Sequence, residues 1–314
     1  VIVAERIKNI RHTLKVLEYH KITGRLADRC ACSLGRRRAE ALKPRSDLAW
    51  VRARLEETSQ ARQALQDEGH VPFGGLTDIG ELLSRARAGR MLDGHEILQV
   101  AAAARAGRLV GDYFARAAEV APDLAALADR LGTYEELEAE VERRLDEEGE
   151  VREDASDALV SLRRREGVLR ERIQHSLESI ADESVRQGRA RERLVVQRSG
   201  RYCIPIRAQE QSRFPGIVHD RSDSGATVFI EPQTIVERGN ELRDTELAIE
   251  EEIKRILREL SGLIGSWAEP LERDQRTLGV LDFIVAKAGL AGQMGATHPR
   301  VRDDRTLDLR AARP

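Results

Sequence analysis

The sequence predicts a mainly α-helical protein: a helical core, and a long antiparallel, coiled-coil-like pair of lever helices that carries a small antiparallel β clamp at its tip. Three observations predict this fold. Charged residues make up 34% of the 314 residues and aromatic residues only 4%, which is typical of helices with large solvated faces. Apolar residues recur every three or four positions over long stretches. Between two such stretches the pattern changes to that of β-hairpins.

The first part of the chain, residues 14–132, is expected to form several short packed helices. Pro44 ends one helix, because proline cannot continue a helical hydrogen-bond ladder. Ser46 is the expected N-cap of the next helix, and Asp93 is the expected N-cap of a longer one. A chain of 314 residues exceeds the usual size of one core, so at least one further region is expected.

The second region begins near Thr133, which is spaced from Glu136 like a capping box. From Leu137 to Ile180 apolar residues recur mostly at intervals of three, four or seven, and no proline interrupts them. One continuous outgoing helix of about 80 Å is therefore expected, at ~1.5 Å per residue. It needs a partner, and the apolar steps of four and three between Ile249 and Leu263 supply a returning helix.

Two β-hairpins are expected between these helices. The first turns at Ser199–Gly200 and the second at Asp223–Gly225, each between runs of β-branched residues. Pro205 must then lie at a sheet edge or at a bulge, because it cannot donate a ladder hydrogen bond. The expected regions are a 1–13 extension, a 14–132 helical core, a 133–191 outgoing lever helix, a 192–232 β clamp, a 233–265 returning lever helix, 266–299 helices returning to the core, and 300–314.

Charge is distributed unevenly along the predicted levers. The net charge of −2 by itself indicates no nucleic-acid partner, but residues 134–154 hold eleven acidic and three basic residues, and residues 189–221 hold eight basic and three acidic residues. Such charge runs are often solvated faces, whereas a basic tip is also typical of a phosphate-binding surface. The candidate nucleic-acid contacts are Arg189, Arg191, Arg193, Arg198, Arg201, Arg207, Arg213 and Arg221.

Signs of catalysis are absent from the sequence. It has no Gly-Lys dipeptide and hence no Walker A loop, and Cys30-x-Cys32 has no second cysteine pair at zinc-binding spacing. Free thiols are the preferred interpretation of all three cysteines. His219 beside Ser222 and Ser224 suggests a nucleophilic site only superficially, because a small hairpin offers no framework for a triad. No catalytic residue, cofactor or metal site is therefore expected in this chain, and a cytoplasmic location is expected.

One segment resembles a known family. Phe214–Pro232, with the sequence FPGIVHDRSDSGATVFIEP, is similar to the clamp of the second bacterial class of MutS-type proteins, the endonuclease paralogue of the mismatch-repair ATPase. Arg201–Arg207 and Glu237–Arg243 fit the same family, as do Leu17-Glu18 and Leu42–Pro44. The resemblance covers most of residues 14–313.

The resemblance implies a core, levers and a clamp, followed in the family by an ATPase domain and a small Smr nuclease domain. Residues 300–314 are then the start of the ATPase domain, and this chain is interpreted as a fragment. ATP and magnesium are expected only for the missing domain. The family is associated with branched DNA and suppression of recombination, and some members act on collided ribosomes, so DNA, or ribosomes and their rRNA, are the expected partners. A homodimer is implied for the parent protein.

Two functions stay open at this point. The chain is either a module that grips nucleic acid through its basic tip, or a structural lever that transmits the nucleotide state of the ATPase domain. A third hypothesis is an independent hydrolase that uses His219 and a nearby serine, or a free cysteine, but it requires a catalytic framework that the sequence does not offer.

Overall fold

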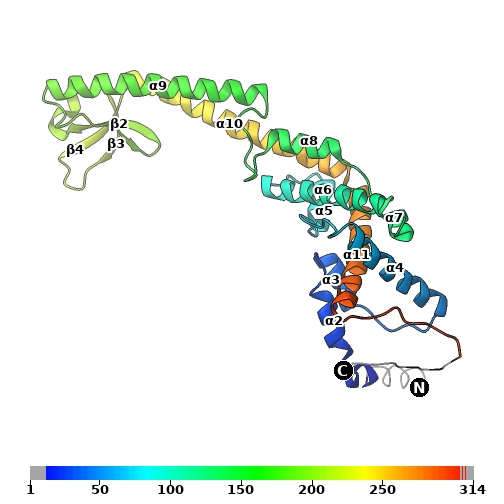
Figure 1. The fold of residues 1–314 in the computed structure, drawn as a ribbon. Helices are drawn as coiled ribbons and strands as arrows, with labels where there is room; N and C mark the ends of the chain where they lie inside the picture. The colour runs from blue at the N-terminus through cyan, green and yellow to red at the C-terminus, as the bar shows by residue number, and fades with distance from the viewer. Residues whose placement is uncertain (1–11, 305, 307, 309–314) are drawn as a thin grey trace. The chain divides into compact units, whose positions relative to one another are not determined.

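The computed structural model describes residues 12–304, 306 and 308 of the chain. The chain divides into two compact units: Val1–Glu150 with Arg258–Pro314, here called the helical unit, and Val151–Leu257, here called the clamp unit. Long helices and one four-stranded antiparallel sheet confirm the predicted fold class (Figure 1). The predicted extension over residues 1–13 lies outside the described residues except at its last two positions.

The helical unit is organised around helix α11, Ala268–Gln293, which packs against most of the other helices of this unit. Further helices of this unit are α2 (Tyr19–Ala27), α3 (Ser33–Glu40), α4 (Leu48–Asp67), α5 (Gly80–Arg87), α6 (Gly94–Arg116), α7 (Pro122–Ala128) and α8 (Glu135–Arg144). The last residues of α10 (Gln233–Ser266) also belong to this unit.

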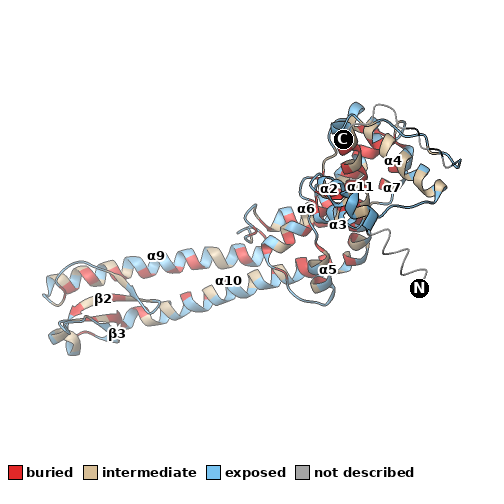
Figure 2. Ribbon diagram, turned by 90° about the horizontal axis from the view of Figure 1, so that it is seen from below, coloured by how far each residue is buried: buried red, intermediate tan, exposed pale blue. Residues whose placement is uncertain are grey.

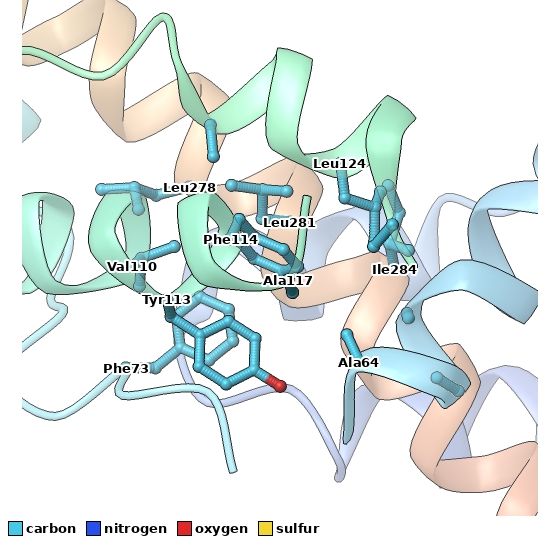
Figure 3. Close-up of a cluster of buried hydrophobic side chains, with 14 of the residues drawn as sticks. Ala64, Phe73, Val110, Tyr113, Phe114, Ala117, Leu124, Leu278, Leu281 and Ile284 are labelled. Carbon is cyan, nitrogen blue, oxygen red and sulfur yellow. The ribbon is translucent and has the colours of Figure 1, made fainter. Parts of the chain in front are cut away.

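An apolar cluster between α6, α7 and α11 forms the main core of the helical unit (Figure 3). Phe114 and Leu281 are completely buried, and the ring of Tyr113 meets Phe114 edge-on at 5.1 Å between centroids. The Tyr113 hydroxyl donates to the Gly69 carbonyl at 2.9 Å, so this large side chain is buried without losing its hydrogen bond. Burial of Phe114 or Leu281 contributes about 1.5–3 kcal/mol each.

The clamp unit consists of helix α9 (Asp157–Arg186), the sheet, and most of α10. The strands lie in the order β1-β2-β4-β3, all antiparallel, with β1 at Val196–Arg198, β2 at Arg201–Arg207, β3 at Gly216–Arg221 and β4 at Thr227–Pro232. Both predicted hairpins are therefore present. Pro205 pairs with Phe229 of β4 and lies past the end of short β1, so β2 is an edge at this position.

The buried residues of α9 lie on one side of the helix (Figure 2). Ile173 and Leu177 of α9 pack with Ile204 of β2 and Ile230 of β4, all four being nearly or fully buried. Helices α9 and α10 run antiparallel within this unit and are joined by side-chain hydrogen bonds. These run from Ser156 to Glu252 at 2.6 Å, from Arg170 to Glu246 at 3.1 Å, and from Arg238 to Ser176 at 2.9 Å.

The prediction of one continuous helix over 133–191 was wrong, because residues 145–156 interrupt it between α8 and α9. The Asp146 carboxylate accepts from the backbone N–H groups of Glu148 and Glu150 at 3.1 and 2.8 Å, which forms a turn instead of a helix. Gly149 adopts φ 81°, a left-handed conformation that favours glycine. Ser156 then caps α9 by accepting from Leu159 N–H at 3.1 Å.

Smaller predictions also need correction. Asp47, not Ser46, caps α4, accepting from Trp50 N–H at 2.9 Å. The expected capping box at Thr133 is not formed, because Tyr134 occupies the N-cap position of α8. Residues 266–299 contain the single helix α11 instead of several helices. Asp93 does cap α6, in a full capping box with Glu96. Within the described part of the chain, no helix is both long enough and apolar enough to span a membrane.

Candidate nucleic-acid interface

The eight candidate arginines do not form one surface. Strand β2 begins at Arg201 and ends at Arg207, so these two residues lie at opposite ends of the sheet, roughly 20 Å apart at ~3.3 Å per residue. Arg198 pairs with Arg201 across the first hairpin. The candidates are thus divided between the two ends of β2, and each end has its own surroundings.

At the first hairpin the arginines are engaged within the protein. The Arg198 guanidinium lies over the Phe229 ring, 4.5 Å from its centroid, and its Nε is 3.3 Å from Asp220 Oδ2. Arg201 Nη1 donates to Asn240 Oδ1 of α10 at 2.8 Å. Both side chains therefore stabilise the sheet and its contact with α10, and a phosphate would have to compete with these partners.

The carboxylate near Arg201 at the first hairpin is that of Glu231, whose side chain is 2% exposed. Its Oε2 is hydrogen-bonded to His219 Nε2 at 2.7 Å, and its Oε1 lies 3.5 Å from Arg201 Nη1 without a hydrogen bond of its own. A Cβ on Gly239 of α10 would lie 3.0 Å from Glu231 Oε1, so glycine gives this carboxylate its room. A buried carboxylate in this position disfavours anion binding at the first hairpin.

Arg193 is also engaged, in this case by α9. It forms ion pairs with Asp182 at 3.1 Å and with Glu178 at 3.4 Å. These pairs fasten the segment between α9 and β1 to the helix surface. Since all three side chains are about half exposed, each pair contributes only about 0–1 kcal/mol.

The other end of β2 has a different arrangement, which we call the arginine cluster. The backbone N–H of Arg207 donates to the Arg189 carbonyl at 2.9 Å, so these two residues are adjacent although 18 positions separate them. Arg221 donates to Gln211 in the 3₁₀ turn Ala208–Arg213 that follows β2. The cluster consists of Arg189, Arg191, Arg207, Arg213 and Arg221.

Among the described residues the arginine side chains of this cluster form few ion pairs, although the Asp220 carboxylate lies beside Arg221 and accepts from its backbone N–H at 2.8 Å. Arg213 pairs with Glu210 at 3.6 Å, and its side chain is 74% exposed. Arg191 and Arg207 are exposed, and no ion pair of theirs occurs within the residues that the structure describes. Their guanidinium groups are thus available to a ligand at low cost, since little internal pairing has to be broken.

A cavity of about 200 Å³ adjoins the cluster at Arg189. Gln233 and Thr234, the first residues of the long helix α10, line it, together with Glu183 of α9. A helix N-terminus carries a partial positive charge and favours anions. Glu183 opposes this effect, so Arg189 and the helix end together determine the potential there.

The histidine and serines of the second hairpin do not form a nucleophilic group in this structure. His219 is bonded to Glu231, as described above. Ser222 accepts from Thr227 N–H at 3.1 Å and lies 3.4 Å from Ser224 Oγ, so these hydroxyls close the turn. Sequence reasoning missed Glu231 and Asn240, since a lone acid in a strand and a lone amide in a helix carry no motif.

The cysteines are free thiols that serve no metal site in the described residues, where no group of three or more His, Cys, Asp or Glu side chains could hold a metal ion. Burial raises the pKa of Cys203 to about 11, and burial likewise raises the pKa of Cys32 to about 11. At neutral pH both therefore remain thiols and poor nucleophiles.

Comparison with known proteins identifies the chain. No protein-family model matches it. The chain is 39% identical over 302 residues to endonuclease MutS2 of Symbiobacterium thermophilum, 40% over 303 residues to that of Geobacillus thermodenitrificans, and 35% over 304 residues to that of Clostridioides difficile. Each comparison covers 96% of this chain. The chain spans only 38% or 39% of the length of these curated relatives.

Identity at this level over nearly the whole chain shows common descent, so the helical unit and the clamp unit are those of a MutS-type protein. Within that class the chain is homologous to MutS2, and it corresponds to about two fifths of a MutS2 protein. The resemblance predicted from the Phe214–Pro232 segment is confirmed.

Proposed function

We propose that the clamp unit grips the phosphate backbone of nucleic acid through the arginine cluster, without reading base sequence. The observation that supports this most directly is the adjacency of the Arg189 and Arg207 backbones. Arg191 follows two positions after Arg189, Arg221 is held to the 3₁₀ turn that carries Arg213, and few ion pairs engage these side chains among the described residues. Arginine binds phosphate bidentately and keeps its charge at every physiological pH. Contacts of this kind position a protein on nucleic acid but carry no sequence information.

The relatives are named endonucleases. We propose that this chain supplies the gripping part of such an enzyme, and that cleavage, with any ATP and magnesium, belongs to other parts of the whole protein. The physiological substrate in this proposal is DNA, branched or duplex, bound independently of sequence. The mostly engaged side chains at the first hairpin stabilise the clamp instead of contacting the ligand.

The test is fluorescence anisotropy of labelled DNA with the full chain at several salt concentrations, using a four-way junction and a plain duplex of equal length. The double variant Arg191→Gln/Arg207→Gln is expected to weaken binding to both DNAs and to reduce the salt slope by about 2, at ~0.9 per phosphate contact. The matched control is Arg164→Gln/Arg172→Gln, which removes the same charge from exposed positions of α9.

Equal loss in both double variants would contradict the proposal, because it would show a general charge effect. Absence of DNA binding by the unaltered chain would also contradict it. In that case salt-sensitive binding to ribosomes would favour the rRNA alternative, and no binding to either would favour the structural lever.

A further inference from the structure

A second candidate site lies in the helical unit. It is distant in sequence from the arginine cluster, which belongs to the clamp unit. Helices α4 and α11 enclose a cavity of about 370 Å³ together with residues from the end of α3. Its wall is mostly apolar, with Leu42, Trp50, Leu55, Phe283 and Ile284. A volume of several hundred Å³ is typical of sites for small molecules.

Polar groups converge at one place in this wall. Lys287 of α11 lines the cavity, and its Nζ makes one long hydrogen bond, to the Arg54 carbonyl at 3.4 Å. Arg54 Nη2 pairs with Glu57 Oε1 at 2.6 Å, whereas Arg54 Nε and Glu57 Oε2 are buried without a hydrogen-bond partner. Both atoms are shielded from solvent, so Lys287 Nζ, with its single long hydrogen bond, is a donor that this wall can offer to a ligand.

The charged side chains that line the cavity favour an anionic ligand. Three cations line the cavity, Arg38, Arg54 and Lys287, against the single carboxylate of Glu57. Burial lowers the pKa of Lys287 to about 8, and the nearby carboxylate of Glu57 offsets this effect only in part. The Lys287 ammonium also lies 5.1 Å from the centroid of the Phe283 ring, which provides only weak compensation.

The aromatic part of the wall is held in place by charge. The guanidinium groups of Arg45 and Arg54 lie 5.0 and 5.9 Å from the centroid of the Trp50 ring. Trp50 is therefore a stacked, oriented surface at one side of the cavity. A flat apolar group fits against such a surface better than a hydrated phosphate does.

We infer that this cavity binds a small apolar monocarboxylate, with its hydrocarbon or aromatic body against Trp50 and Phe283 and its carboxylate at Lys287 Nζ. A ligand of this class gives Lys287 Nζ a close acceptor and places a negative charge beside its ammonium group. The site is independent of the proposed nucleic-acid grip, because it shares no residue with the arginine cluster.

The sequence offers a direct optical test, because Trp50 and Trp267 are the two tryptophans of the chain. Trp267 packs edge-on against Tyr134 at 5.7 Å between ring centroids, so Trp267→Phe preserves an aromatic partner and leaves Trp50 as the single reporter. The probes are 3-phenylpropionate and its neutral analogue 3-phenylpropan-1-ol, titrated into the Trp267→Phe variant of the chain.

Saturable quenching of Trp50 by the acid, with a Kd at least tenfold lower than that of the alcohol, is the expected result. In the Lys287→Gln variant the acid is expected to bind no better than the alcohol. Equal affinities for the two probes in the Trp267→Phe chain, or quenching that does not saturate, would overturn the inference. This comparison of acid with alcohol needs no change at Lys287, so it decides the matter even where Lys287→Gln does not fold.

Discussion

The contact between Glu231, His219 and Arg201 is expected to determine the local stability of the clamp sheet. Replacing Glu231 by leucine removes the carboxylate from a site where it is 2% exposed, and leaves His219 and Arg201 without it. A fully buried charge that loses its partner costs about 3–5 kcal/mol, and a solvent-exposed pair about 0–1 kcal/mol. The remaining side chains are 20% and 31% exposed, so water can partly solvate them. An intermediate loss of about 2 kcal/mol follows.

Glu231→Gln is the matched variant, because it keeps the shape and one acceptor oxygen but removes the charge. A neutral hydrogen bond contributes about 1 kcal/mol less than one to a charged group, so the expected loss is about 1 kcal/mol. The expected stability therefore decreases from wild type to Glu231→Gln and further to Glu231→Leu.

Hydrogen exchange of the β2 and β4 backbone amides measures this locally. A loss of about 2 kcal/mol raises the exchange rate of these amides roughly 30-fold, since every 1.4 kcal/mol is a factor of ten. Amides of α6, in the other unit, serve as the internal control. Unchanged or slower exchange of β2 and β4 in Glu231→Leu would refute the reasoning, and would mean that apolar packing replaces the ionic contact without loss.

Two further predictions concern the helix break and the helix pair. A Cβ at Gly94 would lie 1.7 Å from the Gly149 carbonyl oxygen. Gly94→Ala is therefore expected to lower the free energy of unfolding by about 2 kcal/mol or more, as measured by thermal unfolding. The control Gly24→Ala has open space around the new Cβ and is expected to be neutral or stabilising. Arg255 and then Ser156 lower the pKa of Glu252 to about 2, so wild-type stability falls as the pH drops from about 4.5 towards 2. Urea unfolding at pH 6 and pH 3 should show a smaller fall in Glu252→Gln; an equal fall would contradict this origin of the shift.

The elements that sequence predicted well are those with a local cause. The hairpins depend on turn residues such as Ser199 and Gly200, both with positive φ, between runs of β-branched residues. The seam of α9 depends on apolar spacing alone, so Ile173 and Leu177 could be placed in advance. Homology to MutS2 could also be anticipated, because the residues that carry the resemblance form one contiguous segment, Phe214–Pro232.

The break at residues 145–156 could not be predicted from periodicity. The apolar pattern continues through Leu145 and Leu159, and only the turn at Asp146 and the close approach of Gly149 to Gly94 show why the chain leaves the helix. Contacts of this kind join positions about 55 residues apart, and tertiary contacts override local helix propensity.

The same cause explains why counting charges in a sequence window overestimates the unpaired positive charge of the clamp unit. Eight arginines lie between residues 189 and 221, but Arg193, Arg198 and Arg201 meet carboxylates from α9, β3 and β4. The acidic stretch is reduced in the same way, since Glu138 is held by Arg105 and Arg108 of α6 at 3.2 and 2.8 Å. Formal charge in a sequence window therefore measures the field only after internal pairs are removed.

The number of arginines that remain after the internally paired ones are removed predicts how steeply the affinity for nucleic acid depends on salt concentration. If the five residues of the arginine cluster each meet one phosphate of a duplex, the log–log slope of affinity against salt approaches about −4.5, at ~0.9 per contact. Engagement of all eight arginines would give a slope of about −7. The steeper value would require Arg193, Arg198 and Arg201 to exchange their carboxylates for phosphates, which would loosen the segment before β1 and the first hairpin. Faster hydrogen exchange of β1 and β2 amides on DNA binding would accompany it, whereas the shallower slope leaves those amides as protected as in the free protein.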